Sequence, residues 1–336
     1  MFQVLQVRRC CQFGPASIAQ LRPAKVQLLQ NYGTLGARTR LLHQPSDSSR
    51  PLVRSRVLSC SYNSLSSFFS DGDLTGKQFC FFDLECVHST DSPHLPILIV
   101  AIRCCEYCID NADLDSETWC CGRTRLRKFT RIPNPSKSSH TCLEDFVRWA
   151  CFDKANKNMI CFSHFGSGYD SILVFAELVR QGHKPTKVLS RGCKLLSFTA
   201  GFNVTFRDSY LFFRCSLAKL PGMFGVEASK DFFLMRWLAE GDRFIHYVGP
   251  IPPAEAFEPG RMDPKRRADF ERFYRKEERS KVPFRFYKKL LEYCVMDCVC
   301  LWQTCAKFRE MVLEKCDVDP LKHAVTLASL TSVIYR

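Results

Sequence analysis

The stretch that decides the fold is Phe79-Cys80-Phe81-Phe82-Asp83-Leu84-Glu85-Cys86, an apolar run with two acids set into it. The apolar residues predict a buried β-strand. Side chains two positions apart on a strand project from the same face, so Asp83 and Glu85 point the same way. Two adjacent carboxylates beside an apolar core repel each other and lose solvation, and a bound cation removes both penalties. The stretch therefore predicts a divalent-metal site at the end of a central strand.

Strand and helix patterns alternate along the chain after residue 76. Each predicted strand is a short apolar run, and each predicted helix has apolar residues at helical spacing. The apolar run at 96–102 is the natural antiparallel partner of the opening strand. We predict strands at 78–85, 96–102, 159–163, 187–190, 195–199 and 203–207, and helices at 143–154, 169–181, 264–279 and 284–308. Elements mixed in this order predict an α/β domain around a central mixed sheet with flanking helices.

Two further acids occupy positions that suit a metal site. Asp170 lies at the start of the helix predicted at 169–181, and Asp297 lies within the last long helix. Tyr293 precedes Asp297 by four residues and shares its helix face, so it is placed to orient an attacking water. With Asp83 and Glu85 these acids make four carboxylates, and oxygen ligands of this kind suit two Mg²⁺ or Mn²⁺ ions. Such an ion pair supports in-line displacement at a phosphodiester.

A structural reading of the same acids is open at this stage. Asp170 suits a helix N-cap, Asp297 a surface position, and Asp83 with Glu85 a pair at the end of a sheet. The burial expected for the first strand weighs against this reading, because a buried carboxylate without compensation is costly.

The net charge of +14 is unevenly distributed. Residues 1–70 carry nine Lys and Arg against one acid, a local net charge of +8. A basic chain favours a polyanionic partner, here nucleic acid rather than membrane. No run of about 18 apolar residues occurs, so we expect no membrane span. The segment 1–75 has the composition of a mitochondrial transit peptide, of a basic nucleic-acid-binding arm or of a plain disordered leader.

The chain has 20 cysteines, and many lie inside apolar runs, where cysteine behaves as a small hydrophobe. Without a secretory signal pattern they indicate a reducing intracellular compartment, with nucleus or mitochondrion undecided. A cysteine-rich insert spans about 104–122. Its paired cysteines suit a structural Zn²⁺ site or, alternatively, a degenerate loop with free thiols; they are Cys105, Cys108, Cys120 and Cys121.

Basic and aromatic residues outside the acidic positions allow three smaller predictions. A strip without interleaved acids predicts contact with phosphates: Arg123, Arg125, Arg127, Lys128 and Arg131. The cations of the helix at 264–279 alternate with acids and predict an ordinary solvated face. Four aromatic residues are predicted to lie in the core: Phe206, Tyr210, Phe212 and Phe213.

Three segments occur in a set order: Phe82-Asp83-Leu84-Glu85, then His164-Phe165-Gly166-Ser167-Gly168-Tyr169-Asp170, then Tyr293-Cys294-Val295-Met296-Asp297. Together they resemble the proofreading exonuclease motifs of family B DNA polymerases. The extra glycine before Tyr169 is similar to the protein-primed branch, which has organellar, viral and Maverick/Polinton-type members. The resemblance implies an RNase H-like (DnaQ-like) 3′→5′ exonuclease fold in which two Mg²⁺ or Mn²⁺ ions are held by Asp83, Glu85, Asp170 and Asp297.

The resemblance also implies which residues contact DNA. In the second motif these are His164, Phe165 and Tyr169, and Ser216-Leu217 is similar to an element that contacts single-stranded DNA and a primer protein. Lys230 is similar to a lysine that aids exonuclease catalysis. The family usually carries Asn where this chain has Phe165. Either the ring stacks on a base in place of the amide, or the exonuclease is weakened.

We therefore expect a basic leader at 1–75, an exonuclease domain at 76–316 and the start of a polymerase region at 317–336. No motif of a polymerase palm occurs before Arg336, so this chain alone is not expected to extend a primer. The expected partners are the 3′ end of single-stranded DNA and a terminal (primer) protein. A catalytically weakened module that binds nucleic acid or the primer protein is the alternative function. A free-standing RNase of the same fold is disfavoured by Ser216 and Lys230.

Overall fold

The computed structural model describes residues 76–89, 92–111, 124–131, 141–228, 232–240 and 243–336, which belong to one compact unit. The predicted leader at 1–75 lies outside the described residues, as does Lys230. Within the described ranges, no helix combines the length and the hydropathy that crossing a membrane requires.

A seven-stranded mixed sheet forms the centre of the domain, in the spatial order β3-β2-β1-β4-β7-β6-β5. Its strands are β1 (Gln78–Ser89), β2 (Ser92–Cys105), β3 (Leu126–Thr130), β4 (Ile160–Ser163), β5 (Thr186–Arg191), β6 (Lys194–Ala200) and β7 (Val204–Asp208). β2 is antiparallel to both β1 and β3, β4 runs parallel to β1, and β7 runs parallel to β4. This is the RNase H-like arrangement, as predicted, with the β5–β6 hairpin added at one edge of the sheet.

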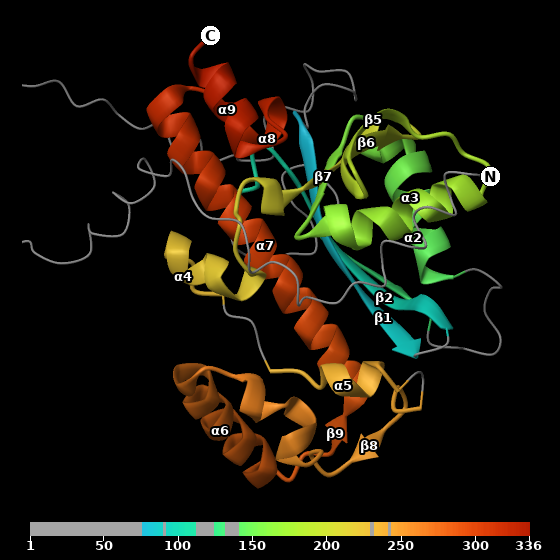
Figure 1. Ribbon diagram of the computed structural model, residues 1–336, viewed down its shortest axis with the longest axis vertical. Helices are drawn as coiled ribbons and strands as arrows, with labels where there is room; N and C mark the ends of the chain where they lie inside the picture. Colours follow the sequence, from blue (N-terminus) through green and yellow to red (C-terminus); the bar gives the residue numbers. More distant parts are fainter. Residues whose placement is uncertain (1–75, 90–91, 112–123, 132–140, 229–231, 241–242) are drawn as a thin grey trace, which may run out of the picture. The chain divides into compact units, whose positions relative to one another are not determined.

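β1 is buried on both faces because helices cover each side of the sheet (Figure 1). Phe79 and Phe81 belong to the core that packs against α7 (Phe286–Cys316). Cys80 and Phe82 belong to the core shared with α2 (Cys142–Phe152) and α3 (Asp170–Arg180). The alternation of side chains along the strand sends successive residues into the two cores.

Local signals account for several element boundaries. α2 starts at a capping box, in which Thr141 and Glu144 satisfy each other's backbone N–H groups. α6 (Pro264–Arg279) has the predicted bounds, with Asp263 as its N-cap. α7 runs on to Cys316, beyond the predicted end at 308, and stops where Asp317 adopts the left-handed conformation. The shorter elements are α4 (Leu220–Phe224), α5 (Met235–Leu238), β8 (Val248–Gly249), β9 (Phe284–Arg285), α8 (Pro320–His323) and α9 (Leu327–Ile334).

The cysteines predicted to act as core hydrophobes are buried: Cys80, Cys86, Cys151, Cys161, Cys294, Cys298, Cys300 and Cys305. Of the four aromatic residues predicted to lie in the core, Phe206, Phe212 and Phe213 are buried, while Tyr210 is half-buried.

The predicted phosphate-contacting strip is wrong at Arg125, whose side chain is only 1% exposed. Its guanidinium donates to the carbonyl oxygens of Asn111 and Cys108 and lies 4.3 Å from the centre of the Trp302 ring. A cation–π contact of this kind pairs residues far apart in sequence, so charge spacing along the chain does not reveal it. Arg127, Lys128 and Arg131 are exposed, and Arg123 lies outside the described residues.

The segment after α7 packs back onto the sheet. Arg207 of β7 donates to three carbonyl oxygens of the α8 segment, those of Leu321, Lys322 and Ala324. Asp319 caps α8 and accepts from Arg309 of α7 at 2.8 Å. These contacts join the last described residues to the same core as β1.

Candidate metal centre

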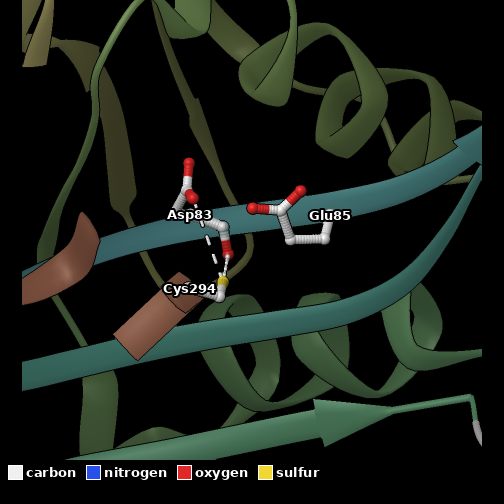
Figure 2. Close-up of side chains that lie close together, drawn as sticks. All are labelled: Asp83, Glu85 and Cys294. Atoms are coloured by element: carbon white, nitrogen blue, oxygen red, sulfur yellow. Dashed lines mark hydrogen bonds between the residues drawn. The ribbon is translucent and has the colours of Figure 1, made fainter. Parts of the chain in front are cut away.

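The two acids of β1 lie together on one face of the strand, as the alternation predicted. Glu85 is buried and Asp83 is half-buried. Figure 2 shows both carboxylates on the strand, with Cys294 of α7 beneath them. One ligand atom from each of Asp83, Glu85 and Cys294 falls within 4.8 Å of the others. This group of three has the size and donor types of a metal-binding cluster.

Cys294 is a neighbour that sequence reasoning missed. Its Sγ lies 3.6 Å from the backbone oxygen of Asp83 and 3.9 Å from Asp83 Oδ2, within the range of a weak thiol hydrogen bond. Burial raises the pKa of this thiol, helped by Cys298 and by the charge of Asp83, so the sulfur keeps its proton and donates. Spacing along the helix placed Cys294 on the apolar side of α7, but the register of α7 against β1 is a tertiary property.

Asp170 of α3 lies against β1, the strand that carries Asp83 and Glu85. It is the first residue of α3, not its N-cap, which is Tyr169, so the capping interpretation is wrong. Its carboxylate is buried and accepts hydrogen bonds from the backbone N–H groups of Leu84 and of Asp170 itself. Burial raises the pKa of this carboxyl, and the negative charge of Asp83 raises it further. A buried acid beside another acid is the electrostatic setting that a cation relieves.

Tyr293 and Asp297 face the site from α7. Asp297 is 3% exposed, so its interpretation as a surface acid is wrong. The Tyr293 hydroxyl hydrogen-bonds the Asp297 carboxylate one helical turn away. Burial raises the pKa of Tyr293, and the charges of Asp297, Glu85 and Asp83 raise it further, so the phenol stays protonated. Asp170 and Asp297 are not members of the compact group formed by Asp83, Glu85 and Cys294.

The loop after β4 presents an aromatic ring at the same edge of the sheet. Phe165 has a φ of 65°, in the left-handed region, and its side chain is 46% exposed. The ring packs edge-on against Tyr210 with centroids 5.4 Å apart. A Cβ at Gly168 would come within 2.8 Å of Phe165 Cε1, so the ring needs a glycine there. Phe165 therefore combines an exposed aromatic ring with a strained backbone.

His164 supports this loop from inside. Its Nε2 donates to the carbonyl oxygen of Cys215 at 2.8 Å, and its Nδ1 hydrogen-bonds Ser209 Oγ at 2.9 Å. Both ring nitrogens therefore bond protein atoms. The contact with Cys215 also ties the loop to Ser216, which is exposed at the start of the turn Leu217–Lys219. Leu217 packs partly against the larger core.

Tyr169 lies where β1 and β2 meet. Its hydroxyl is 2.6 Å from His94 Nδ1 and hydrogen-bonds the thiol of Cys86. Burial raises the pKa of Tyr169. Sequence reasoning missed both partners, because neither His94 nor Cys86 belongs to a recognisable motif with Tyr169.

The predicted zinc ligands are only half described. Cys105 and Cys108 are buried at the end of β2, with their sulfurs 3.5 Å apart. Cys120 and Cys121 lie outside the described residues. The Zn²⁺ site therefore stays a prediction.

Comparison with known proteins gives a consistent result. The family model described as DNA polymerase type B, organellar and viral, matches residues 150–336. A probable DNA polymerase of Neurospora intermedia is 27% identical over 184 residues, which cover 52% of this chain and 18% of that protein. A probable DNA polymerase of Ascobolus immersus is 23% identical over 184 residues, 52% of this chain and 15% of that protein. The chain thus spans less than a fifth of the length of these relatives.

Solved structures of phi29 DNA polymerase are also similar to this chain. The orthorhombic crystal form matches with a TM-score of 0.39 at 8% identity and covers 71% of this chain and 32% of that one. The complex with single-stranded DNA matches with a TM-score of 0.39 at 10% identity, covering 72% and 33%. The family match spans the segments around Asp170 and Asp297 but begins after β1, so Asp83 and Glu85 are placed by the structure alone.

Proposed function

Because this chain belongs to the organellar and viral type B DNA polymerases, we propose that residues 76–316 form a 3′→5′ exonuclease domain that hydrolyses single-stranded DNA. The observation that supports the proposal is the pair of β1 acids in a compact group with Cys294, with an acid of α3 and an acid of α7 in electrostatic reach of the site. Asp83 and Glu85 come from β1, Asp170 comes from the start of α3, and Asp297 comes from α7. The charge of Asp83 raises the pKa of Asp170, and the charges of Asp297, Glu85 and Asp83 raise the pKa of Tyr293.

The donor set fits two divalent cations of the Mg²⁺ or Mn²⁺ type. Asp83, Glu85, Asp170 and Asp297 would hold them, since hard cations prefer carboxylate oxygens. A buried carboxyl beside a like charge, as Asp170 is beside the half-buried Asp83, gains most from a cation. When bound, the ions would activate a water molecule and stabilise the leaving oxygen of the phosphodiester.

The protein's own groups would position the reactants. Tyr293, kept protonated by its buried setting, has a hydroxyl that can hold a water beside Asp297. The backbone N–H of Leu84 orients the Asp170 carboxylate. Phe233 packs against the Tyr293 ring with centroids 5.2 Å apart, which limits movement of the phenol.

The DNA strand would enter along the loop after β4. We propose that the exposed ring of Phe165 stacks on a base, a contact that tolerates any sequence. His164 would act indirectly, because its two nitrogens hold the loop to Ser209 and Cys215. Ser216 and Tyr169 flank the same loop. The proposal also includes a catalytic role for Lys230 and a terminal protein as a partner.

The test is degradation of 5′-end-labelled single-stranded DNA by the full chain with Mg²⁺ or Mn²⁺. We expect stepwise release of mononucleotides from the 3′ end, lost in Asp83→Asn. Glu314→Gln, which changes an exposed acid of α7, is the matched control and keeps full activity. Intact DNA in the presence of either metal, under conditions where the protein binds it, overturns the exonuclease.

A module that binds nucleic acid without cleaving it is the second candidate. The exposed Phe165 ring favours it, because stacking on a base needs no metal. The same assay separates the two functions, since binding without shortening of the DNA is the signature of the module.

A further inference from the structure

The β5–β6 hairpin ends at the same edge of the sheet as the carboxylates. Ser163 at the end of β4 pairs with Asp208 at the end of β7, and β6 runs antiparallel to β7, with Ser197 opposite Arg207. The first residue of β6, Lys194, therefore lies beyond the end of β7, on the side of the loop that follows Ser163. Figure 1 shows the hairpin as the last two strands of the sheet. Three strand spacings, about 14 Å, separate β1 from β6.

This hairpin is basic and contains no acid. From residue 181 to residue 207 the sequence has no Asp or Glu. The exposed cations in this interval are Lys184, Lys187, Arg191 and Lys194. α6 differs, because its cations alternate with acids and Arg272 and Arg275 form ion pairs within the helix. A run of cations without acids favours a polyanion more strongly than a mixed helix does.

Two of the cations are direct cross-strand partners. Arg191 at the end of β5 pairs with Lys194 at the start of β6. Like charges directly opposite each other destabilise an antiparallel pair, and an anion between them removes this repulsion. The pair therefore has the charge and placement of a phosphate site.

Lys194, one member of the cation pair, stands beside the exposed aromatic ring. Lys194 Nζ lies 5.8 Å from the centre of the Phe165 ring. The ring packs against Tyr210 and lies close to Gly168, and these contacts restrict its position. A flat ring next to two cations matches one nucleotide, with its base on the ring and its phosphate at the cations.

We propose that Arg191, Lys194 and Phe165 form a subsite for one nucleotide of the single strand whose 3′ end reaches the carboxylates. This inference rests on the proposed function for the direction of the strand, but the binding it describes needs no metal. The hairpin would hold the strand a few nucleotides away from the 3′ end.

The first experiment measures binding of a fluorescent oligothymidylate to the full chain in EDTA over a range of salt concentrations. Arg191→Ala/Lys194→Ala should weaken binding at least tenfold. It should also lower the slope of log affinity against log salt by about 0.7, the contribution of one neutralised phosphate on a single strand. Lys154→Ala/Lys157→Ala removes two exposed lysines before β4, at the opposite end of that strand, and should leave both values unchanged.

The second experiment locates the stacked base with oligonucleotides that carry one abasic site at successive positions. Wild-type protein should lose about tenfold in affinity at one position near the 3′ end. Phe165→Ala should lose about tenfold on the intact strand, keep the salt slope, and show no further loss at that position. Equal sensitivity of Phe165→Ala and wild type at every position overturns the role of the ring.

The outcomes separate this inference from the exonuclease. If the hairpin double variant loses binding while wild type releases no nucleotides, the subsite stands and the hydrolysis fails. If wild type degrades DNA and the double variant binds as the control does, the subsite fails. Aggregation of the double variant with unchanged affinity of its soluble fraction also overturns it, because the cations would then only keep an edge strand soluble.

Discussion

Two regions of this domain bury charged side chains, with different patterns of sign. Near α8, Arg309 pairs with Asp319 at 2.8 Å, and Arg207 donates to the carbonyl oxygens of the same segment. At the end of β1, Asp83, Glu85, Asp170 and Asp297 all carry the same sign. The first region satisfies its charges internally, as structural ion pairs do. The second gathers charges that an external cation would balance, which is why we propose it as the functional region.

The largest expected effect is on catalysis. Asp83→Asn should reduce mononucleotide release about 10³-fold, because it removes a carboxylate that would hold a metal. The thermal midpoint of the metal-free protein should not fall, since the substitution removes one of several like charges. Rates are measured with end-labelled single-stranded DNA and melting by circular dichroism. If the variant unfolds instead, Asp83 is needed for stability and the proposed catalytic role is contradicted.

A substitution in the ion-paired region near α8 should lower the free energy of unfolding. Asp319→Asn should lower the free energy of unfolding by about 3 kcal/mol, because it leaves Arg309 buried without its counter-charge. Chemical denaturation measures this loss. Asp269→Asn breaks the exposed ion pair with Arg272 on α6 and should cost less than about 0.5 kcal/mol. Equal losses in the two variants would mean that the burial of Asp319 has no energetic consequence.

An Asp-to-Asn substitution among the acids around β1 should change the free energy of unfolding in the opposite direction. Asp170→Asn should raise the stability of the protein in EDTA by about 1 kcal/mol, because it removes a buried charge that Asp83 repels. The amide oxygen can still accept the hydrogen bond from the N–H of Leu84. Denaturation with and without Mn²⁺ shows whether the gain disappears when the metal is present. A loss of more than about 1 kcal/mol in EDTA contradicts the comparison.

The smallest effect concerns the loop that carries Phe165. Gly168→Ala should weaken binding of single-stranded DNA about fivefold, because its Cβ displaces the ring, at a cost of about 1 kcal/mol in stability. Gly222→Ala, where nothing lies within 4 Å of a new Cβ in helix α4, should leave DNA binding unchanged and should not lower the stability. If both variants bind like wild type, the position of the ring does not matter.

Much of the sheet could be predicted from the sequence because its strands are separate apolar runs. The pairing of β1 with the run at 96–102 is confirmed, with Asp83 opposite Val100. Helices with strong local signals, such as α6, also have the predicted bounds. The burial of Arg125 against Trp302 was not predictable, since it depends on how α7 crosses the chain between β2 and β3.

In the candidate site, too, some features follow from local sequence patterns and others do not. The acids of β1 could be placed on one face from the strand period alone. Cys294 beside Asp83 and His94 beside Tyr169 depend on the register between distant segments, which no local pattern encodes. The same holds for Lys194 beside Phe165, which requires the order of the strands in the sheet.

The most direct test of the central claim is a calorimetric titration of the metal-free full chain with Mn²⁺. The claim is that the like-charged acids around β1 form a cation site. We predict saturable binding of about two ions to wild type, and loss of at least one ion in Asp83→Asn with unchanged folding. The absence of saturable binding to the folded wild-type protein, or equal binding to the variant, would contradict the account.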